Sequence, residues 1–170
     1  LDNISRIHKP ALNKIMITAS RAGNAGIVWW AICLPFLINS NWRATGANFV
    51  FGLAWAHLMG EIIIKHIVKR VRPCHTLDDD EQLIDRPRFY SFPSGHTTAS
   101  FAMVGVALMR CRAITFMPIL LLAMLIAFSR IYLRVHYLTD VIAGMILGLT
   151  CGICSVLIFN TVVPMWFPMV

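Results

Sequence analysis

Three short groups of polar residues interrupt an otherwise apolar chain, and their side chains are of types that can bind and attack an anion. Lysine and arginine hold anionic oxygens, a Ser-Gly pair that opens a helix offers backbone N–H groups, and histidine can act as a nucleophile or a proton donor. Taken alone, each group also fits a structural role, as snorkelling basic residues or as helix caps. The groups are Lys65, Arg72 and Pro73; Pro93, Ser94, Gly95 and His96; and Ser129, Arg130, His136 and Asp140.

The first group predicts a cationic helix end. Lys65 and Arg72 are seven residues apart, which places them on one face of a helix that Pro73 would end. Two cations on one face can hold a phosphate from the same side.

The other two groups predict an anion site and an activated imidazole. Ser94 and Gly95 are suited to open a helix whose N–H groups and dipole attract an anion, with His96 in the first turn. His136 and Asp140 are four residues apart and would share a helical face. The carboxylate would then hold one ring nitrogen and leave the other free to attack.

Transmembrane helices are the elements that must position these groups. The chain has 170 residues, 58% of them hydrophobic, and a mean hydropathy of +0.69, which is too apolar for a soluble domain of this size. We therefore expect one all-α domain over residues 1–170, an integral-membrane bundle of about five transmembrane helices over 23–163. Residues 1–22 predict an interfacial amphipathic helix, and 73–93 form the catalytic loop. The apolar segments are 23–39, 44–66, 94–109, 113–131 and 138–163.

This topology brings all three groups to the same side of the membrane, because an even number of crossings separates the segment ends that carry them. Several independent structural coincidences would be needed to explain that gathering. The net charge of +7 indicates anionic lipid headgroups, since no basic stripe typical of nucleic-acid binding is present.

Small residues predict how the helices pack. Gly144, Gly148 and Gly152 recur every four residues, a pattern that lets two helices approach closely. Packing within the bundle is favoured over a homodimer through this face, which is kept as the alternative. The three cysteines inside apolar segments are expected to pack as small hydrophobes.

The three groups together resemble the three-part signature of the type-2 phosphatidic-acid phosphatase superfamily, K-x6-RP, PSGH and SR-x5-H-x3-D, with every position filled. The resemblance implies a membrane lipid phosphatase in which His136 forms a phosphohistidine, Asp140 orients it, and His96 serves as acid and then base. It also implies phosphate binding by a further set of residues without a metal or cofactor. That set is Lys65, Arg72, Ser94, Gly95 and Arg130.

Further polar residues near the three groups have more than one possible role. Glu61 is expected to pair with Lys65 or His57, because an isolated ionisable group inside a membrane is costly, and a direct role at the substrate is the alternative. Lys69 and Arg70 would contact a second phosphate, the headgroup or the interface, and Arg134 and Tyr137 would line the lipid entry. The acidic run Asp78, Asp79, Asp80 and Glu81 fits a solvated loop better than a metal site.

Substrate and orientation are left open by the sequence. Polyprenyl diphosphate, phosphatidylglycerol phosphate and phosphatidic acid all suit the resemblance, while a vanadium haloperoxidase-like enzyme and a non-catalytic lipid-binding protein are the rival classes. The positive-inside rule would place the polar face in the cytoplasm. Members of the family usually work on the extracytoplasmic face of the cell membrane, and we expect the same of this multi-pass protein.

Overall fold

The computed structural model describes residues 8–76, 82–87 and 90–166 and is helical wherever it has regular secondary structure within them. The predicted all-α class is confirmed. The helices are α1 (Pro10–Ala22), η2 (Asn24–Gly26), α2 (Ile27–Ile38), η3 (Ser40–Trp42), α3 (Arg43–His57), the π-helix η4 (Leu58–Ile64), α4 (Lys65–Val68), η5 (Pro73–Thr76), α5 (Gly95–Arg110), α6 (Ala113–Tyr132) and α7 (Leu138–Trp166).

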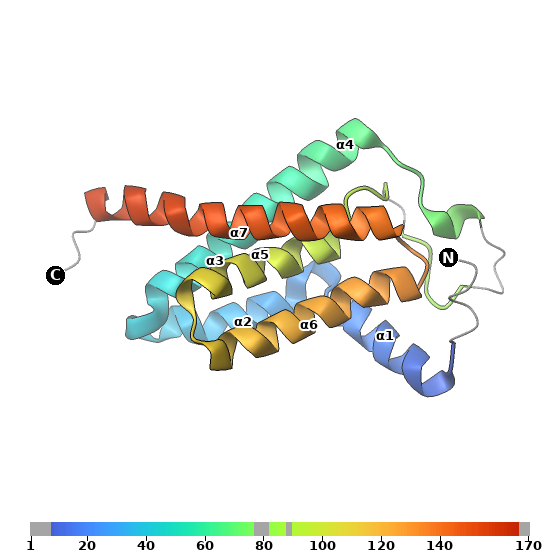
Figure 1. The fold of residues 1–170 in the computed structure, drawn as a ribbon, viewed down its shortest axis with the longest axis horizontal. Helices are drawn as coiled ribbons and strands as arrows, with labels where there is room; N and C mark the ends of the chain where they lie inside the picture. The colour runs from blue at the N-terminus through green and yellow to red at the C-terminus, as the bar shows by residue number, and fades with distance from the viewer. Residues whose placement is uncertain (1–7, 77–81, 88–89, 167–170) are drawn as a thin grey trace.

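The helices form a bundle around α5, which contacts α3, α6 and α7 (Figure 1). The segments that follow α4, precede α5 and join α6 to α7 gather at one end of this bundle, on the right in Figure 1. The predicted meeting of the three polar groups at one end is therefore confirmed for the fold.

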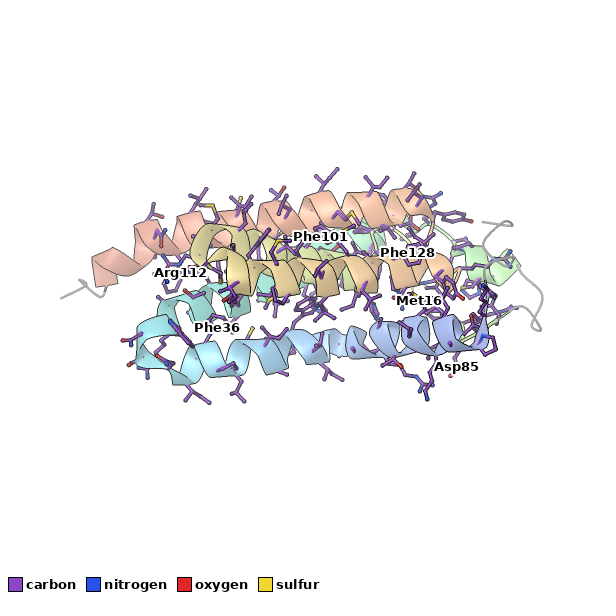
Figure 2. The ribbon with its side chains drawn as sticks, turned by 60° about the horizontal axis from the view of Figure 1, so that its bottom comes forward. Met16, Phe36, Asp85, Phe101, Arg112 and Phe128 are labelled. Atoms are coloured by element: carbon purple, nitrogen blue, oxygen red, sulfur yellow. The ribbon has the colours of Figure 1, made fainter. Side chains whose placement is uncertain are left out.

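The apolar helices make this a membrane protein. Three segments are long and apolar enough to cross a bilayer on their own, namely Ser40–Val68, Ala113–Tyr132 and Leu138–Val162. Pro10–Ala22 and Asn24–Ile38 make a fourth if the pair, bent by 58°, is one broken span. α5 has only 16 residues and lies largely inside the bundle, so it is not among these segments, and the number of five crossings stays a prediction. Apolar side chains cover the outside of the helices (Figure 2), and Phe128 on α6 is 47% exposed.

The amphipathic segment predicted over residues 1–22 is a helix from Pro10 onward and packs on α6. Met16, Ala19 and Ser20 form its buried face. This face meets protein, so α1 belongs to the bundle. An interfacial position in the bilayer stays a prediction.

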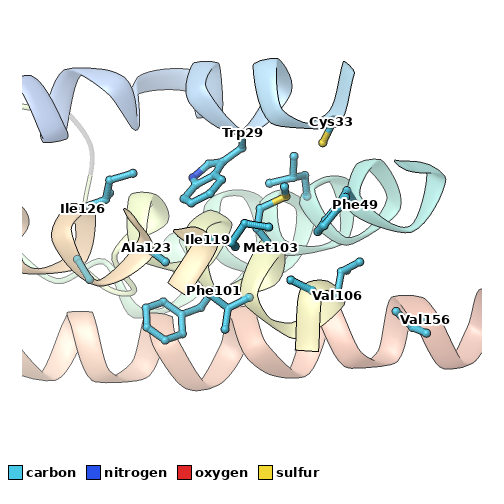
Figure 3. Packing of buried hydrophobic residues seen from close by; sticks show 14 of the residues in the cluster. Trp29, Cys33, Phe49, Phe101, Met103, Val106, Ile119, Ala123, Ile126 and Val156 are labelled. Carbon is cyan, nitrogen blue, oxygen red and sulfur yellow. The ribbon is translucent and has the colours of Figure 1, made fainter. Parts of the chain in front are cut away.

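One hydrophobic core joins α2, α3, α5, α6 and α7. Trp29 of α2 is fully buried among side chains of α5 and α6 (Figure 3). Its indole Nε1 donates to Ser100 Oγ at 3.1 Å, which satisfies the one polar atom of the ring. Cys33 and Cys151 are buried, as predicted for small hydrophobes.

The glycine face of α7 packs directly on α5. A Cβ on Gly148 would overlap the carbonyl oxygen of Thr98, and one on Gly152 would overlap that of Ala102. A Cβ on Gly144 would lie 2.9 Å from Ser94 O. Packing within the bundle is thus confirmed. The alternative, a homodimer through these glycines, has no support, because α5 already covers the face.

Gly148→Ala is expected to destabilise the protein by a few kcal/mol, since a methyl group cannot fit against the α5 backbone without separating the helices. The midpoint of thermal unfolding in detergent measures the effect. Thr150→Ala, on the exposed face of the same helix, is the matched control and should change the midpoint little. Equal midpoints for Gly148→Ala and the control would show that α5 and α7 need no close contact.

Candidate active site

The chain leaves its helix earlier than the sequence predicts, and this changes how the first polar group is built. α4 ends at Val68, and Lys69 takes a left-handed conformation with φ 49°. Arg72 therefore lies in an irregular segment and does not share a helical face with Lys65, so that part of the prediction was wrong. Pro73 begins the 3-10 helix η5 and does not end α4.

The second group opens a helix as predicted. Ser94 is the N-cap residue of α5, Gly95 is its first residue, and His96 lies in the first turn. The Ser94 hydroxyl is fully buried and accepts a hydrogen bond from Thr97 Oγ1 at 2.9 Å. The backbone N–H of Ser94 donates to the carbonyl oxygen of Asp140 at 3.0 Å, which links the second polar group to the third.

His136 and Asp140 are paired, although not through a shared helical face. His136 precedes α7, whose first residue is Leu138, and it follows a turn in which Arg134 has φ 56°. The carbonyl oxygen of Arg130 accepts from the His136 N–H and so ties this turn to the end of α6. The Asp140 Oδ2 atom then lies 3.6 Å from His136 Nδ1. The predicted pair is correct, but its geometry comes from the turn.

Asp140 is held by residues from two other segments. Its Oδ2 accepts from Ser91 Oγ at 2.5 Å, and its Oδ1 accepts from Arg70 Nη1 at 2.8 Å. The Ser91 hydroxyl also lies 3.4 Å from His136 Nδ1. Ser91 was missed from the sequence, because a serine two residues before Pro93 carries no distinguishing spacing. Arg70 pairs with Asp140 and lies over the Tyr137 ring, so its Nη1 is not free for a headgroup.

The opposite side of the His136 ring faces a cation. Arg72 Nη1 lies 2.9 Å from His136 Nε2 and donates to Val135 O at 3.0 Å. Burial, reinforced by the charges of Arg72 and Arg130 and opposed by Asp140, lowers the pKa of His136 to about 3. A lowered histidine pKa keeps the ring neutral at every pH above that value, so the ring has a lone pair at neutral pH.

His96 is oriented by the break between α1 and α2. Its Nε2 lies 2.9 Å from Oδ1 of Asn24, the first residue of η2. An amide oxygen only accepts, so Nε2 carries the proton in this contact. Gly23, the residue before Asn24, lies close to the same ring. A Cβ at this position would be 2.7 Å from the His96 ring, so glycine leaves the room that the ring needs. Asn24 was also missed from the sequence, because it is 72 residues away from His96.

A cavity of about 990 Å³ brings most of the predicted site residues together. Asp140 and Ser94 are fully buried and do not line it. The bent segment at residues 23–26 and residues 83–87, which follow η5 in the chain, form part of the cavity wall. Arg130 is buried there, and its Nη1 donates to Ser20 Oγ on α1. The predicted residues that line the cavity are Lys65, Arg72, Gly95, His96, Arg130 and His136.

The remaining predictions have separate outcomes. Glu61 pairs with Lys65, at 2.5 Å between Oε1 and Nζ, so that predicted pairing is confirmed. His57 lines the cavity. The acidic run at residues 78–81 lies outside the described residues.

The cavity at the polar end of the membrane bundle brings His96 and His136 together with the cationic side chains of Lys65, Arg72 and Arg130, the set expected of a membrane-embedded phosphatase. Such a set can hold a phosphate group while one imidazole attacks it. The chain belongs to the PAP2 superfamily, whose family model matches residues 45–164. The resemblance stated from the sequence is thereby confirmed, and the protein is a lipid phosphatase that hydrolyses a phosphoric ester or anhydride.

Relatives with known names support this placement. Over 152 residues, the chain is 32% identical to the undecaprenyl-diphosphatase of Sulfolobus acidocaldarius, covering 88% of this chain and 72% of that protein. It is 39% identical to the decaprenylphosphoryl-5-phosphoribose phosphatase of Mycobacterium tuberculosis, covering 72% of this chain and 63% of that protein. Phosphatidylglycerophosphatase B of Bacillus subtilis is 28% identical over 84% of this chain and 73% of its own length.

Two solved structures share the fold. LpxE of Aquifex aeolicus superposes with a TM-score of 0.77 at 26% identity and covers 89% of both chains. A transmembrane PAP2-type phosphatidylglycerolphosphate phosphatase of Bacillus subtilis superposes with a TM-score of 0.76 at 22% identity, covering 95% of this chain and 83% of its own.

Proposed function

We propose that this phosphatase cleaves the phosphate of its lipid through a phosphohistidine on Nε2 of His136. The contact that carries this proposal is the placement of the His136 ring, with Nδ1 toward Asp140 and Ser91 and Nε2 toward Arg72. The Nε2 lone pair attacks phosphorus, and the bond from phosphorus to the leaving oxygen breaks. Asp140 stabilises the positive charge that develops on the ring.

His96 acts as the acid and then as the base. In the first step its doubly protonated ring gives a proton to the leaving oxygen of the lipid and becomes neutral, and in the second the neutral ring accepts a proton from the attacking water. That water displaces His136 and releases inorganic phosphate. The hydrogen bond to Asn24 supports this role because it restrains a ring that lines the cavity.

Lys65, Arg72, Arg130 and the Gly95 N–H hold the non-bridging oxygens of the phosphate. All four residues line the cavity, and their charge offsets the charge of the transition state. Arg72 exchanges its contact with His136 Nε2 for a phosphate oxygen when the substrate enters. We assign Ser94 a structural role at the start of α5, because its buried hydroxyl is bonded to Thr97.

A polyprenyl-linked phosphate is the substrate class we favour. The relatives named for undecaprenyl and decaprenyl lipids support it, as does the apolar wall of the cavity at Trp30, Leu53 and Ala54. Phosphatidylglycerol phosphate and phosphatidic acid are the other candidates, the former supported by the Bacillus relative.

Phosphate release from a panel of purified lipids in detergent tests the substrate. We expect kcat/KM for a polyprenyl diphosphate to exceed that for the two glycerolipids by about tenfold or more, a difference of about 1.4 kcal/mol in the transition state. The corresponding polyprenol, which has the same chain but no phosphate, is the control for inhibition by the lipid chain alone. A preference for phosphatidylglycerol phosphate would move the assignment to that lipid, and no release from any of the three would contradict the proposal.

We further propose that the cavity opens on the extracytoplasmic face, which the family resemblance supports. Labelling of a cysteine in intact cells would report the side. Cys74 is fully buried and unsuitable, whereas His75→Cys places a thiol at an exposed position beside it. We expect an impermeant reagent to label this thiol in intact cells. Labelling only after the cells are opened would place the cavity on the cytoplasmic face.

A further inference from the structure

Glu61 lies against the residues that the proposed function assigns to the substrate phosphate. Its Oε1 atom is 2.5 Å from Lys65 Nζ, and a Cβ on Gly95 would overlap the same oxygen. The carboxylate therefore contacts the first residue of α5 while it is bonded to Lys65. It is 30% exposed and lines the cavity, whereas the Lys65 side chain is 4% exposed.

The position of Glu61 depends on the irregular middle of its helix. Glu61 lies in the π-helix η4, between α3 and α4, and Gly60 beside it packs against Thr98 of α5. A Cβ on Gly60 would lie 3.3 Å from the Thr98 side chain, so the two helices are in close contact at this level. The packing holds Glu61 at the start of α5.

A carboxylate in this place satisfies the same groups that a phosphate would satisfy. The Lys65 ammonium and the N–H groups of the first turn of α5 are ligands for an anion. The Glu61 carboxylate pairs with Lys65 and lies against Gly95, the first residue of α5, which avoids leaving a buried lysine unpaired.

On the basis of the proposed function, we infer that Glu61 is a resident anion that competes with phosphate for Lys65 and the start of α5. A phosphate that binds there displaces the carboxylate and remains beside its negative charge. Placing like charges next to each other is costly, so Glu61 weakens the binding of small oxyanions. A lipid substrate gains further binding from its chain, whereas released inorganic phosphate does not. Glu61 thus selects against the product and favours its departure.

The affinity for orthophosphate and for vanadate tests this inference. Both are measured from the rise in the midpoint of thermal unfolding with oxyanion concentration, which requires no turnover. Glu61→Gln keeps the size of the side chain and removes its charge, and we expect it to bind both oxyanions about tenfold more tightly than the wild-type protein. Glu61→Asp, whose shorter side chain draws the carboxylate back, should give a smaller gain.

Two controls separate competition from a general effect of charge. Asp85→Asn removes a negative charge from the wall of the same cavity and should leave the affinity nearly unchanged. In the double variant Glu61→Gln/Lys65→Gln, the gain should disappear because the contested ligand is absent.

Unchanged or weaker oxyanion binding in both Glu61→Gln and Glu61→Asp would overturn the inference. A lower midpoint without oxyanion, together with an unchanged affinity, would show that Glu61 only supports Lys65. Failure of the lipid panel would instead contradict the proposed function, and it would leave the oxyanion measurement as an independent result.

Discussion

Replacing His136 with alanine is expected to lower phosphate release by about four powers of ten or more, because a covalent mechanism loses its nucleophile. The remaining cations can still bind the lipid, so the loss falls on kcat far more than on KM. The ring is fully buried between Asp140 and Arg72, and the cavity contains no second imidazole held in the same way among the described residues.

Trapping of the intermediate makes this prediction specific. Enzyme mixed with a substrate carrying labelled phosphate and quenched in base should retain acid-labile label in the wild type and none in His136→Ala. His75→Ala, an exposed histidine near the same end, is the matched control and should keep both turnover and label. Substantial turnover by folded His136→Ala would contradict the assigned nucleophile.

Replacing His96 with alanine should lower turnover of an alkyl phosphate by about 10²–10⁴-fold, the usual contribution of a general acid and base. The effect should depend on the leaving group. An alkyl oxygen needs a proton as the bond to phosphorus breaks, whereas an aryl oxygen such as that of p-nitrophenyl phosphate departs readily without one.

The rapid first phase of nitrophenol release tests whether His96 serves as the acid in the first step and as the base in the second. His96→Ala should release about one equivalent of nitrophenol per enzyme and then stall, because the phosphohistidine forms but no base activates water. Asn24→Ala keeps the imidazole and loses only its hydrogen bond, so a milder loss of turnover is expected. Equal losses for the alkyl and aryl substrates, with no burst, would contradict the role of His96 as the acid.

Hydropathy and residue spacing were sufficient to predict the class of fold and most of the site. Apolar segments long enough for a bilayer must be helices, because their backbone groups have no other partners in lipid. The predicted segments match α2, the α3–α4 region, α5, α6 and α7 closely. Once the segments are placed, the parity of crossings brings Lys65, His96 and His136 to one end without knowledge of any contact.

Local geometry was harder to predict because it depends on where regular helix stops. The spacing of Lys65 and Arg72 suggested one continuous helix, yet the left-handed Lys69 ends it. His136 and Asp140 suggested a shared helical face, yet the histidine lies in the preceding turn. Lys65 and Arg72 nevertheless line the same cavity, and His136 still lies beside Asp140. Contacts with other segments set the path of the chain beyond the end of a helix.

The helical membrane class, the chemistry of the three polar groups and their common side can be predicted from the sequence, because hydrophobicity and periodicity are local properties of the chain. The side chains that orient the two imidazoles are visible only in the folded molecule. Ser91 and Asn24 act across 45 and 72 residues, and no local pattern specifies such distances along the chain. The contact of Glu61 with Gly95 has the same origin, because it exists only where α5 packs against the π-helix.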